Sequence, residues 1–332
     1  MQKTGLIKNV LFNFKNDEQK DHYNNNEEII KKLYNDLSNI LFDGLNKIEE
    51  ISIGKCCKIN YYDVFYLMFI KSSFKHSYQS IIDEIYCKNN FSLSDTALRK
   101  RNANISIEFY KKIFDNLKKL FYECNDSSLG KNLCCDGTES SCYILLKSYE
   151  FNSVPTDKYC EVFVSTLYDS DNEYPIDFSV SKTLNERDSF LCLLHNVNKF
   201  DIVLFDRGYP CFTFMRTLND RGIRYIIRAT LAFGCVKEIK KNNKKFVFKD
   251  FKGNKEHPPF RLIKQTIDQS LSKFYEEDHE NEYYFFTNIY DIEPSEIQLL
   301  YFKRWKIEIF YDKFKNNVDG KFLYTQSEKR AI

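Results

Sequence analysis

The sequence predicts an α/β protein in which a mixed sheet is flanked by helices and follows an all-helical N-terminal domain. Two observations lead to this prediction. Up to about Cys124, apolar residues recur at three- and four-residue steps, which is the period of amphipathic helices. After a polar linker at 125–132, three β-rich runs follow one another, and further strands then alternate with helices. This order is typical of a mixed sheet covered by helices.

The composition is that of a folded protein outside the membrane. The 332 residues are 43% hydrophobic and 29% charged, and the net charge of +2 does not by itself identify a protein that binds polyanions. No apolar run approaches the roughly 18 residues that span a bilayer, and no signal-peptide core is present. We therefore expect an intracellular protein, located in the cytoplasm and nucleoid or in the nucleus according to its host. Eleven Cys without a C-x-x-C pair favour reduced thiols over a metal site.

The predicted helical domain covers residues 1–126. Its helices are expected at 27–45, 61–74, 77–87 and 106–124. Residues 77–105 have the pattern of a helix, a short turn and a capped second helix with the basic residues Arg99 and Arg101 near its end. Two interpretations stay open for this segment: a DNA-binding helix-turn-helix, or a plain helical bundle with a solvated basic end.

The second predicted domain covers residues 130–332. Strands are expected at 133–146, 160–170, 174–182, 201–209 and 224–230, with helices at 185–200 and 210–222. A basic, β-rich insertion at about 231–285 contains strands at 244–254 and 258–264. One more strand at 281–291 precedes a helix at 301–315, for which Pro294 and Ser295 are start signals.

The insertion carries a local excess of positive charge. Nine Lys and one Arg lie between Lys237 and Lys264, against three acidic residues, an excess of seven charges. Such a segment suits the phosphate backbone of a nucleic acid. Four of its residues are predicted DNA-binding residues: Lys240, Lys241, Lys244 and Lys245.

Three acidic residues are candidates for a shared site. Asp136 is expected to end the strand in "LCCDGT", and Asp206 the strand in "DIVLFDRGY". Each is followed at once or within two residues by Gly, which opens space beside the carboxylate for a ligand. Carboxylates that converge without enough cations repel one another unless a divalent metal ion lies between them. Oxygen ligands suit Mg²⁺ or Mn²⁺, and two such ions roughly 4 Å apart support phosphodiester chemistry.

Glu308, the third acid, has two interpretations. On one helix, it lies with Tyr301, Arg304 and Lys315 in a stripe about 60° wide. It can be the i,i+4 partner of Arg304 on an ordinary amphipathic helix, worth roughly 0.2–0.5 kcal/mol. Alternatively, it is a third metal-binding carboxylate beside the two aspartates.

These motifs resemble those of a known family. Tyr301, Arg304, Glu308 and Lys315, separated by two, three and six residues, resemble the Tyr-Arg-Glu-Lys signature of the DDE transposases of the insertion sequence four family. The "DGT" at Asp136 and the "DRGY" at Asp206 resemble the first and second acidic motifs of that family. The resemblance covers about residues 130 to 320.

The resemblance implies a ribonuclease H-like catalytic fold with a mainly β insertion between the second Asp and the Glu. It implies that Asp136, Asp206 and Glu308 form a catalytic triad that binds two Mg²⁺ or Mn²⁺ ions. Arg304 and Lys315 would hold DNA phosphates, and Tyr301 would contact the backbone. The implied activity is metal-dependent phosphodiester hydrolysis at transposon ends, followed by strand transfer into target DNA. The implied assembly is a homodimer in a synaptic complex with DNA.

One departure from the family keeps alternatives open. Family members usually continue well beyond the Lys of the signature, whereas this chain ends seventeen residues after Lys315. We therefore expect a truncated C-terminus. Two alternatives to the transposase remain: a transposase-derived DNA-binding protein without catalytic activity, and a stand-alone DNA nuclease with two metal ions.

Overall fold

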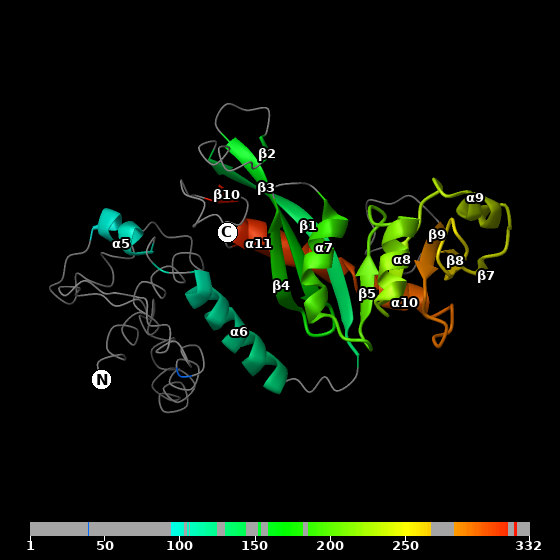
Figure 1. Cartoon of the computed structure of the whole chain (residues 1–332), viewed down its shortest axis with the longest axis horizontal. Helices are drawn as coiled ribbons and strands as arrows, with labels where there is room; N and C mark the ends of the chain where they lie inside the picture. Colours follow the sequence, from blue (N-terminus) through cyan, green and yellow to red (C-terminus); the bar gives the residue numbers. More distant parts are fainter. Residues whose placement is uncertain are drawn as a thin grey trace, which may run out of the picture. The chain divides into compact units, whose positions relative to one another are not determined.

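The computed structural model describes residues 39, 94–102, 105, 107–124, 130–143, 152–153, 159–181, 185–266, 282–317 and 322–323. The chain divides into two compact units. One consists of Met1–Asp126 with Phe314–Ile332, and the other of Ser127–Lys313. Figure 1 labels the helices and strands. None of the described helices is long and apolar enough to cross a membrane.

The first unit contains α5 (Asp95–Asn102) and α6 (Ile107–Cys124). Ser94 caps α5, since its Oγ accepts a hydrogen bond from the Ala97 amide at 3.2 Å. Helix α6 buries Phe109, Ile113 and Asn116 at three- and four-residue steps, so one face of it is packed. Apart from the helical residue Asn39, the helices predicted at 27–45, 61–74 and 77–87 lie outside the described residues. Both interpretations of residues 77–105 therefore stay open.

The second unit is built on one mixed sheet. Its strands are β1 (Asn132–Tyr143), β2 (Asn152–Ser153), β3 (Tyr159–Asp169), β4 (Tyr174–Ser181), β5 (Ile202–Phe205), β6 (Arg224–Arg228), β7 (Phe246–Phe251), β8 (Phe260–Thr266) and β9 (Glu282–Thr287). The order is β2-β3-β1-β5-β6-β9-β8-β7, and β4 also pairs with β3. Strands β1, β5 and β6 are parallel, whereas β3 is antiparallel to both β1 and β4. This mixed arrangement, with helices on it, fits a ribonuclease H-like domain, as predicted.

The predicted basic segment extends this sheet. Strands β7, β8 and β9 add to β6 in antiparallel pairs. The segment also contains α9 (Gly234–Lys240), which the sequence analysis missed. This helix forms because Val236 and Ile239, three residues apart, both enter the core. The domain limits, including the insertion at 231–285, stay a prediction.

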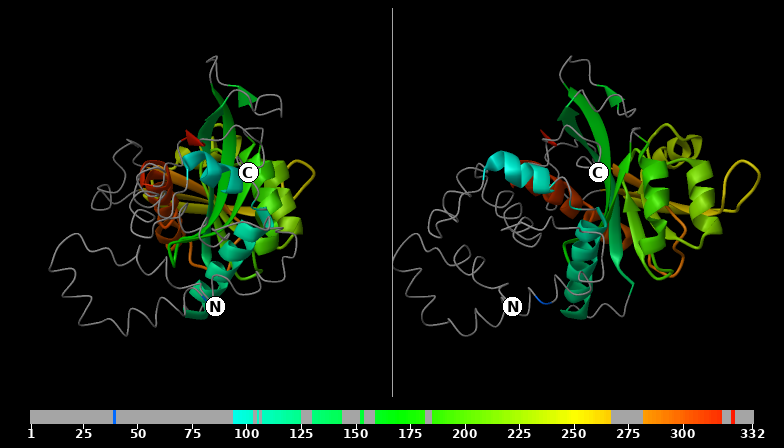
Figure 2. Two further views of the ribbon diagram at one scale, coloured as in Figure 1. Left: turned by 90° about the vertical axis from the view of Figure 1, so that its left-hand side faces the viewer. Right: turned by 60° about the vertical axis from the view of Figure 1, so that its left-hand side comes forward.

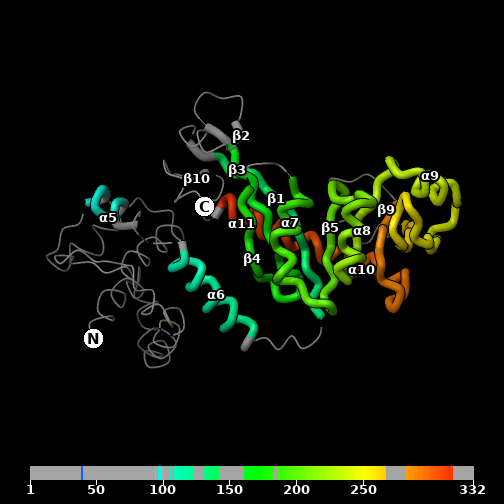
Figure 3. The backbone as a smooth tube through the Cα atoms, in the orientation of Figure 1, coloured from blue at the N-terminus to red at the C-terminus, as the bar shows by residue number. Residues whose placement is uncertain are grey.

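Helices cover both faces of the sheet (Figures 1, 2 and 3). One face carries α7 (Glu186–Leu193), its 3₁₀ extension Leu194–Asn196, and α8 (Phe212–Asp220); the other carries α10 (Ile297–Phe302) and the first part of α11 (Trp305–Asn317). Aromatic rings form the contacts. Phe205 of β5 lies 4.8 Å from Phe190 and 5.4 Å from Phe214, measured between ring centroids. On the opposite face, Phe285 of β9 lies 4.9 Å from Tyr301 of α10.

Candidate active site

Asp136 and Asp206 lie near the same edge of the sheet. Strand β1 pairs in parallel with β5 only from Asn132 to Cys134, and Asp136 follows this paired stretch by two positions. Asp206 directly follows β5. Because the carboxyl ends of parallel strands meet at one edge, the two carboxylates come together. The prediction that Asp136 ends its strand was wrong, because β3 pairs with β1 as far as Tyr143 and extends it.

The two neighbouring glycines serve different purposes. The Gly137 amide donates to Asp136 Oδ1 at 2.8 Å, and the Gly208 amide donates to Asp206 Oδ1 at 2.6 Å. A Cβ atom at Gly137 would lie 1.8 Å from the ring of Phe163, so that ring fills the space predicted for a ligand. At Gly208 a Cβ atom would instead lie 3.1 Å from Asp206 Oδ1. Only Gly208 keeps space open beside a carboxylate group.

The single helix predicted at 301–315 is interrupted. Tyr301 lies in α10, Glu308 lies in α11, and Lys303 and Arg304 form the link between the helices. The amides of Lys303 and Arg304 bond to carbonyls three residues back, at 3.1 and 2.9 Å, instead of four. The Lys303 carbonyl also accepts a 3.8 Å hydrogen bond from the Cys134 thiol of β1. The stripe expected for one continuous helix therefore does not extend across the link.

Arg304 connects the third acid to the first. Its Nη2 donates to Glu308 Oε1 at 2.5 Å, and its Nη1 lies 3.7 Å from Asp136 Oδ2. The Arg304 side chain is 12% exposed, so water screens these interactions weakly. The i,i+4 pair anticipated from the sequence is thus present. The same guanidinium also brings Glu308 into the neighbourhood of Asp136.

The environment of Asp136 disfavours its negative charge. Burial raises the pKa of Asp136 to about 6, and the charges of Asp206 and Glu308 act in the same direction. Arg304 and the Gly137 amide act in the opposite direction but do not cancel this effect. An added cation would therefore stabilise the negatively charged form of Asp136.

Glu186 is a fourth carboxylate of this site that the sequence analysis did not single out. It is the first residue of α7, whose N-cap Asn185 accepts a hydrogen bond from the Asp188 amide. Glu186 Oε2 lies 3.2 Å from the position of a Cβ atom on Gly208, beside Asp206 Oδ1. Burial raises the pKa of Glu186 to about 7, and the charges of Asp206 and Asp136 add to this rise.

Comparison with protein families identifies this arrangement. Residues 137–330 match the family model described as the transposase DDE domain. The chain belongs to this family. The matched segment begins one residue after Asp136 and contains Asp206 and Glu308. Among the curated proteins compared with this chain, none matches it.

The carboxylates of this DDE domain fit a divalent cation by their chemistry. DDE transposase domains generally depend on divalent metal ions, and oxygen ligands suit Mg²⁺ and Mn²⁺. Within the described residues, no three His, Cys, Asp or Glu side chains are arranged as a complete metal-binding group. Between Asp136 and Glu308, the guanidinium of Arg304 takes the place of a cation. The carboxylates thus offer oxygen atoms of the kind that a divalent cation takes, and Arg304 is the internal counter-ion of Asp136 and Glu308.

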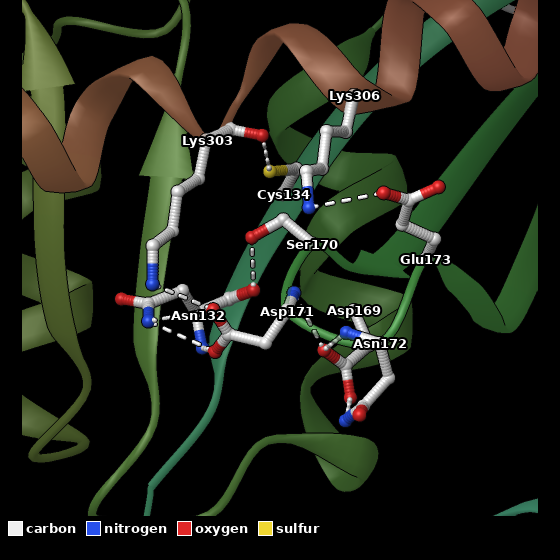
Figure 4. Close-up of polar contacts among 9 residues, drawn as sticks. All are labelled: Asn132, Cys134, Asp169, Ser170, Asp171, Asn172, Glu173, Lys303 and Lys306. Atoms are coloured by element: carbon white, nitrogen blue, oxygen red, sulfur yellow. Dashed lines mark hydrogen bonds and ion pairs between the residues drawn. The ribbon is translucent and has the colours of Figure 1, made fainter.

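A cluster of polar residues holds the α10–α11 link of the DDE domain against the sheet (Figure 4). Lys303 Nζ lies 2.6 Å from Asp171 Oδ1, in the turn between β3 and β4. Asp171 also accepts hydrogen bonds from the amide and side chain of Asn132 on β1. Lys306 Nζ lies 3.1 Å from Glu173 Oε1 in the same turn. These contacts fix the chain on both sides of Arg304.

The thiols near the site are structural. The five cysteines whose side chains the structure describes are free. Cys134 and Cys135 of β1 are fully buried, and burial raises the pKa of both to about 12. Protonated thiols are poor metal ligands. The predicted reduced state is confirmed for the five described cysteines.

Tyr301 and Lys315, two residues of the signature that are predicted to contact DNA, differ in their surroundings. Tyr301 is 4% exposed and packs against Phe285, with its ring 5.8 Å from the guanidinium carbon of Arg304. Lys315 lies in the last turn of α11, on the part of that helix that belongs to the first compact unit. Their roles in DNA binding stay predictions.

The predicted basic residues of the DDE domain are accessible. Lys240 ends α9, Lys241 is its C-cap, and both are exposed, as are Lys244 and Lys245 before β7. Other cations of the segment are neutralised: Arg261 pairs with Asp250 at 2.8 Å, Lys249 with Glu238 at 3.7 Å, and buried Lys264 with Glu282 at 2.8 Å. Lys240 also lines a cavity of about 220 Å³ with Arg207 and Arg228. Arg99 and Arg101 lie on α5, but their side chains fall outside the described residues.

Proposed function

We propose that this DDE-domain protein is a transposase of the insertion sequence four type that cuts DNA at transposon ends and joins those ends to target DNA. One observation carries the proposal. Asp136 and Asp206 both lie just beyond the stretch over which β1 and β5 pair in parallel, and Arg304 bridges Asp136 to Glu308 of α11. The spacing of Tyr301, Arg304, Glu308 and Lys315 supports the assignment to this type.

The proposed triad is Asp136, Asp206 and Glu308, which would hold two Mg²⁺ or Mn²⁺ ions. When bound, these ions activate the attacking oxygen and stabilise the leaving one. The sheet contributes rigidity, since Asp136 lies within β1, where it is paired with β3, and Asp206 directly follows β5. Glu308 contributes from α11 and has to exchange its contact with Arg304 for a contact with a cation.

Two reactions follow in sequence on the DNA. In the first, a water oxygen bonds to phosphorus and the bond to the 3′ oxygen breaks, which leaves a 3′ hydroxyl and a 5′ phosphate. In the second, that 3′ hydroxyl attacks a target phosphodiester and displaces its 3′ oxygen. Arg304 is suited to bind the DNA in these reactions. Once it is released from Glu308, its planar guanidinium can bind a phosphate. Lys315 and Tyr301 would contact neighbouring parts of the backbone.

The partner is DNA, and the exposed lysines of the α9–β7 region would hold it through its phosphates. Four lysines are proposed for this role: Lys240, Lys241, Lys244 and Lys245. Each phosphate that they neutralise releases counterions, so this part of the affinity depends on salt. A homodimer would bring two transposon ends together in a synaptic complex.

A specific observation favours a second candidate function, DNA binding without catalysis. Arg304 already lies within ion-pair distance of both Asp136 and Glu308, so part of their negative charge is compensated without metal. A protein that never binds metal would keep this arrangement permanently. The acidic pair Asp206 and Glu186 argues against this candidate. Within the described residues neither carboxylate forms an ion pair, so without metal their mutual repulsion is not compensated by an ion pair.

The test compares two variants on DNA that carries the element's own ends, with Mg²⁺ or Mn²⁺. Glu308→Gln removes the charge of the third acid and keeps its shape, and Glu296→Gln makes the same change at an exposed position before α10. We expect Glu308→Gln to reduce cleavage by about a thousandfold or more while DNA binding persists, and Glu296→Gln to cut like its parent. Cleavage that survives Glu308→Gln would refute the triad. No cleavage by the parent would favour the non-catalytic candidate.

A further inference from the structure

Glu186 and Asp206 form an acidic pair beside Gly208. An added Cβ atom on Gly208 would lie 3.1 Å from Asp206 Oδ1 and 3.2 Å from Glu186 Oε2. The two oxygen atoms thus flank one small space, which Gly208 leaves empty. Two carboxylates that face the same space repel each other unless a cation joins them.

The basic side chain of the adjacent residue Arg187 forms an ion pair with neither acid. Arg187 follows Glu186 on α7, but its guanidinium is directed to backbone carbonyls of the loop after β5. Its Nε donates to the Tyr209 carbonyl at 3.0 Å and its Nη2 to the Gly208 carbonyl at 2.8 Å. Arg187 therefore ties the start of α7 to the Asp206 loop without neutralising either carboxylate through an ion pair. The loop and the helix are held together so that the acids stay close.

The backbone also favours negative charge at this place. Glu186 is the first residue of α7, and the amides at a helix N-terminus carry partial positive charge. Asp206 accepts the Gly208 amide at 2.6 Å. The oxygen of Asp206 that flanks the space, Oδ1, is also the one that accepts the Gly208 amide, and a carboxylate oxygen can accept a second contact from a shared ligand.

We propose that Glu186 is a fourth metal-binding carboxylate, which holds a divalent cation together with Asp206 across Gly208. This inference rests on the proposed function, because it adds a residue to the same metal centre. It extends the triad with a residue from α7, a helix that contains none of the motifs quoted from the sequence.

The experiment measures Mn²⁺ binding to the full chain by isothermal titration calorimetry and by electron paramagnetic resonance of the free ion. The test variants are Glu186→Gln, which removes the charge, and Glu186→Asp, which keeps the charge but withdraws the carboxylate. The control is Glu108→Gln, since Glu108 is an exposed acid in the first turn of α6. Melting temperatures without metal are measured for all four proteins.

We expect Glu186→Gln to weaken Mn²⁺ binding about tenfold or more, with a smaller loss for Glu186→Asp and none for Glu108→Gln. Without metal, the melting temperature of Glu186→Gln should equal or exceed that of the parent, because the repulsion with Asp206 is relieved. Parental Mn²⁺ affinity in both Glu186 variants would overturn this inference and leave the proposed function intact. A parent chain that binds no Mn²⁺ would overturn both.

Discussion

The contact between Lys303 and Asp171 provides a direct test of how the site is held together. The perturbation is a double-mutant cycle with Lys303→Met and Asp171→Asn. Lys303 contacts Asp171 in the β3–β4 turn (Figure 4). Because Lys303 immediately precedes Arg304, this contact holds the link that presents Arg304 to Asp136. Asn at position 171 can still accept the hydrogen bonds of Asn132, but it no longer forms an ion pair. The cycle therefore isolates the charge interaction.

The expected magnitude follows from distance and exposure. The 2.6 Å separation is that of a charge-assisted hydrogen bond, but Lys303 and Asp171 are 38% and 32% exposed, so solvent screens the pair. Burial acts to raise the pKa of Asp171, yet the contacts with Lys303 and Asn132 hold it below its ordinary value. We expect a coupling free energy of about 0.5–1 kcal/mol. For a unit of this size, that corresponds to about 1–4 °C in melting temperature.

The assay is urea unfolding of the parent, the two single variants and the double variant, with cleavage of end DNA measured in parallel. The matched control is the neighbouring pair Lys306 and Glu173, separated by 3.1 Å, in which Glu173 is 57% exposed. That pair should show a smaller coupling energy and a smaller effect on cleavage. A coupling energy of zero for Lys303 and Asp171, or one no larger than the control, would show that this contact does not hold the link.

Two further predictions concern acid stability and salt. The pKa of Asp136 rises on folding from 3.8 to about 6, so the folded chain binds the proton more tightly and loses stability as the pH rises from about 4 to about 6. Metal-free thermal unfolding between pH 4 and 8 should show this loss in the parent and a smaller one in Asp136→Asn; equal pH profiles would contradict it. The other change replaces four exposed lysines by Gln: Lys240, Lys241, Lys244 and Lys245. The slope of log affinity for DNA against log salt should flatten by up to about four units, as measured by fluorescence anisotropy, and an unchanged slope would place these lysines away from phosphates.

Most strands and helices of the second unit could be predicted from the sequence. The run "IVLF" of β5 is buried at all four positions, and such a run predicts a central strand directly. The predicted mixed sheet with helices on it agrees with the structure, because the local periodicity of the sequence sets the type of each element. Helix α9 was missed because seven residues are too few for a clear helical period among the many lysines.

The details of the candidate site were less predictable. The position of Asp136 relative to the end of its strand is set by pairing with β3, which continues as far as Tyr143. The ring of Phe163 closes the space at Gly137, although the two residues are far apart in the chain. The break between α10 and α11 coincides with contacts from Lys303 to Cys134 and Asp171, both on other elements. Each difference arises from a long-range contact.

The sequence by itself determined the period of each element and the presence of Asp136, Asp206 and Glu308 in segments that resemble transposase motifs. Spacing along one strand or helix depends on local backbone geometry, so it can be read from neighbouring residues. Only the tertiary structure decided that Arg304 bridges Asp136 and Glu308, and that Glu186 and Asp206 flank the same space beside Gly208. These residues come from different elements, and their distances depend on strand order and helix packing. Such distances are set by the whole fold, because no local pattern specifies which strand ends meet.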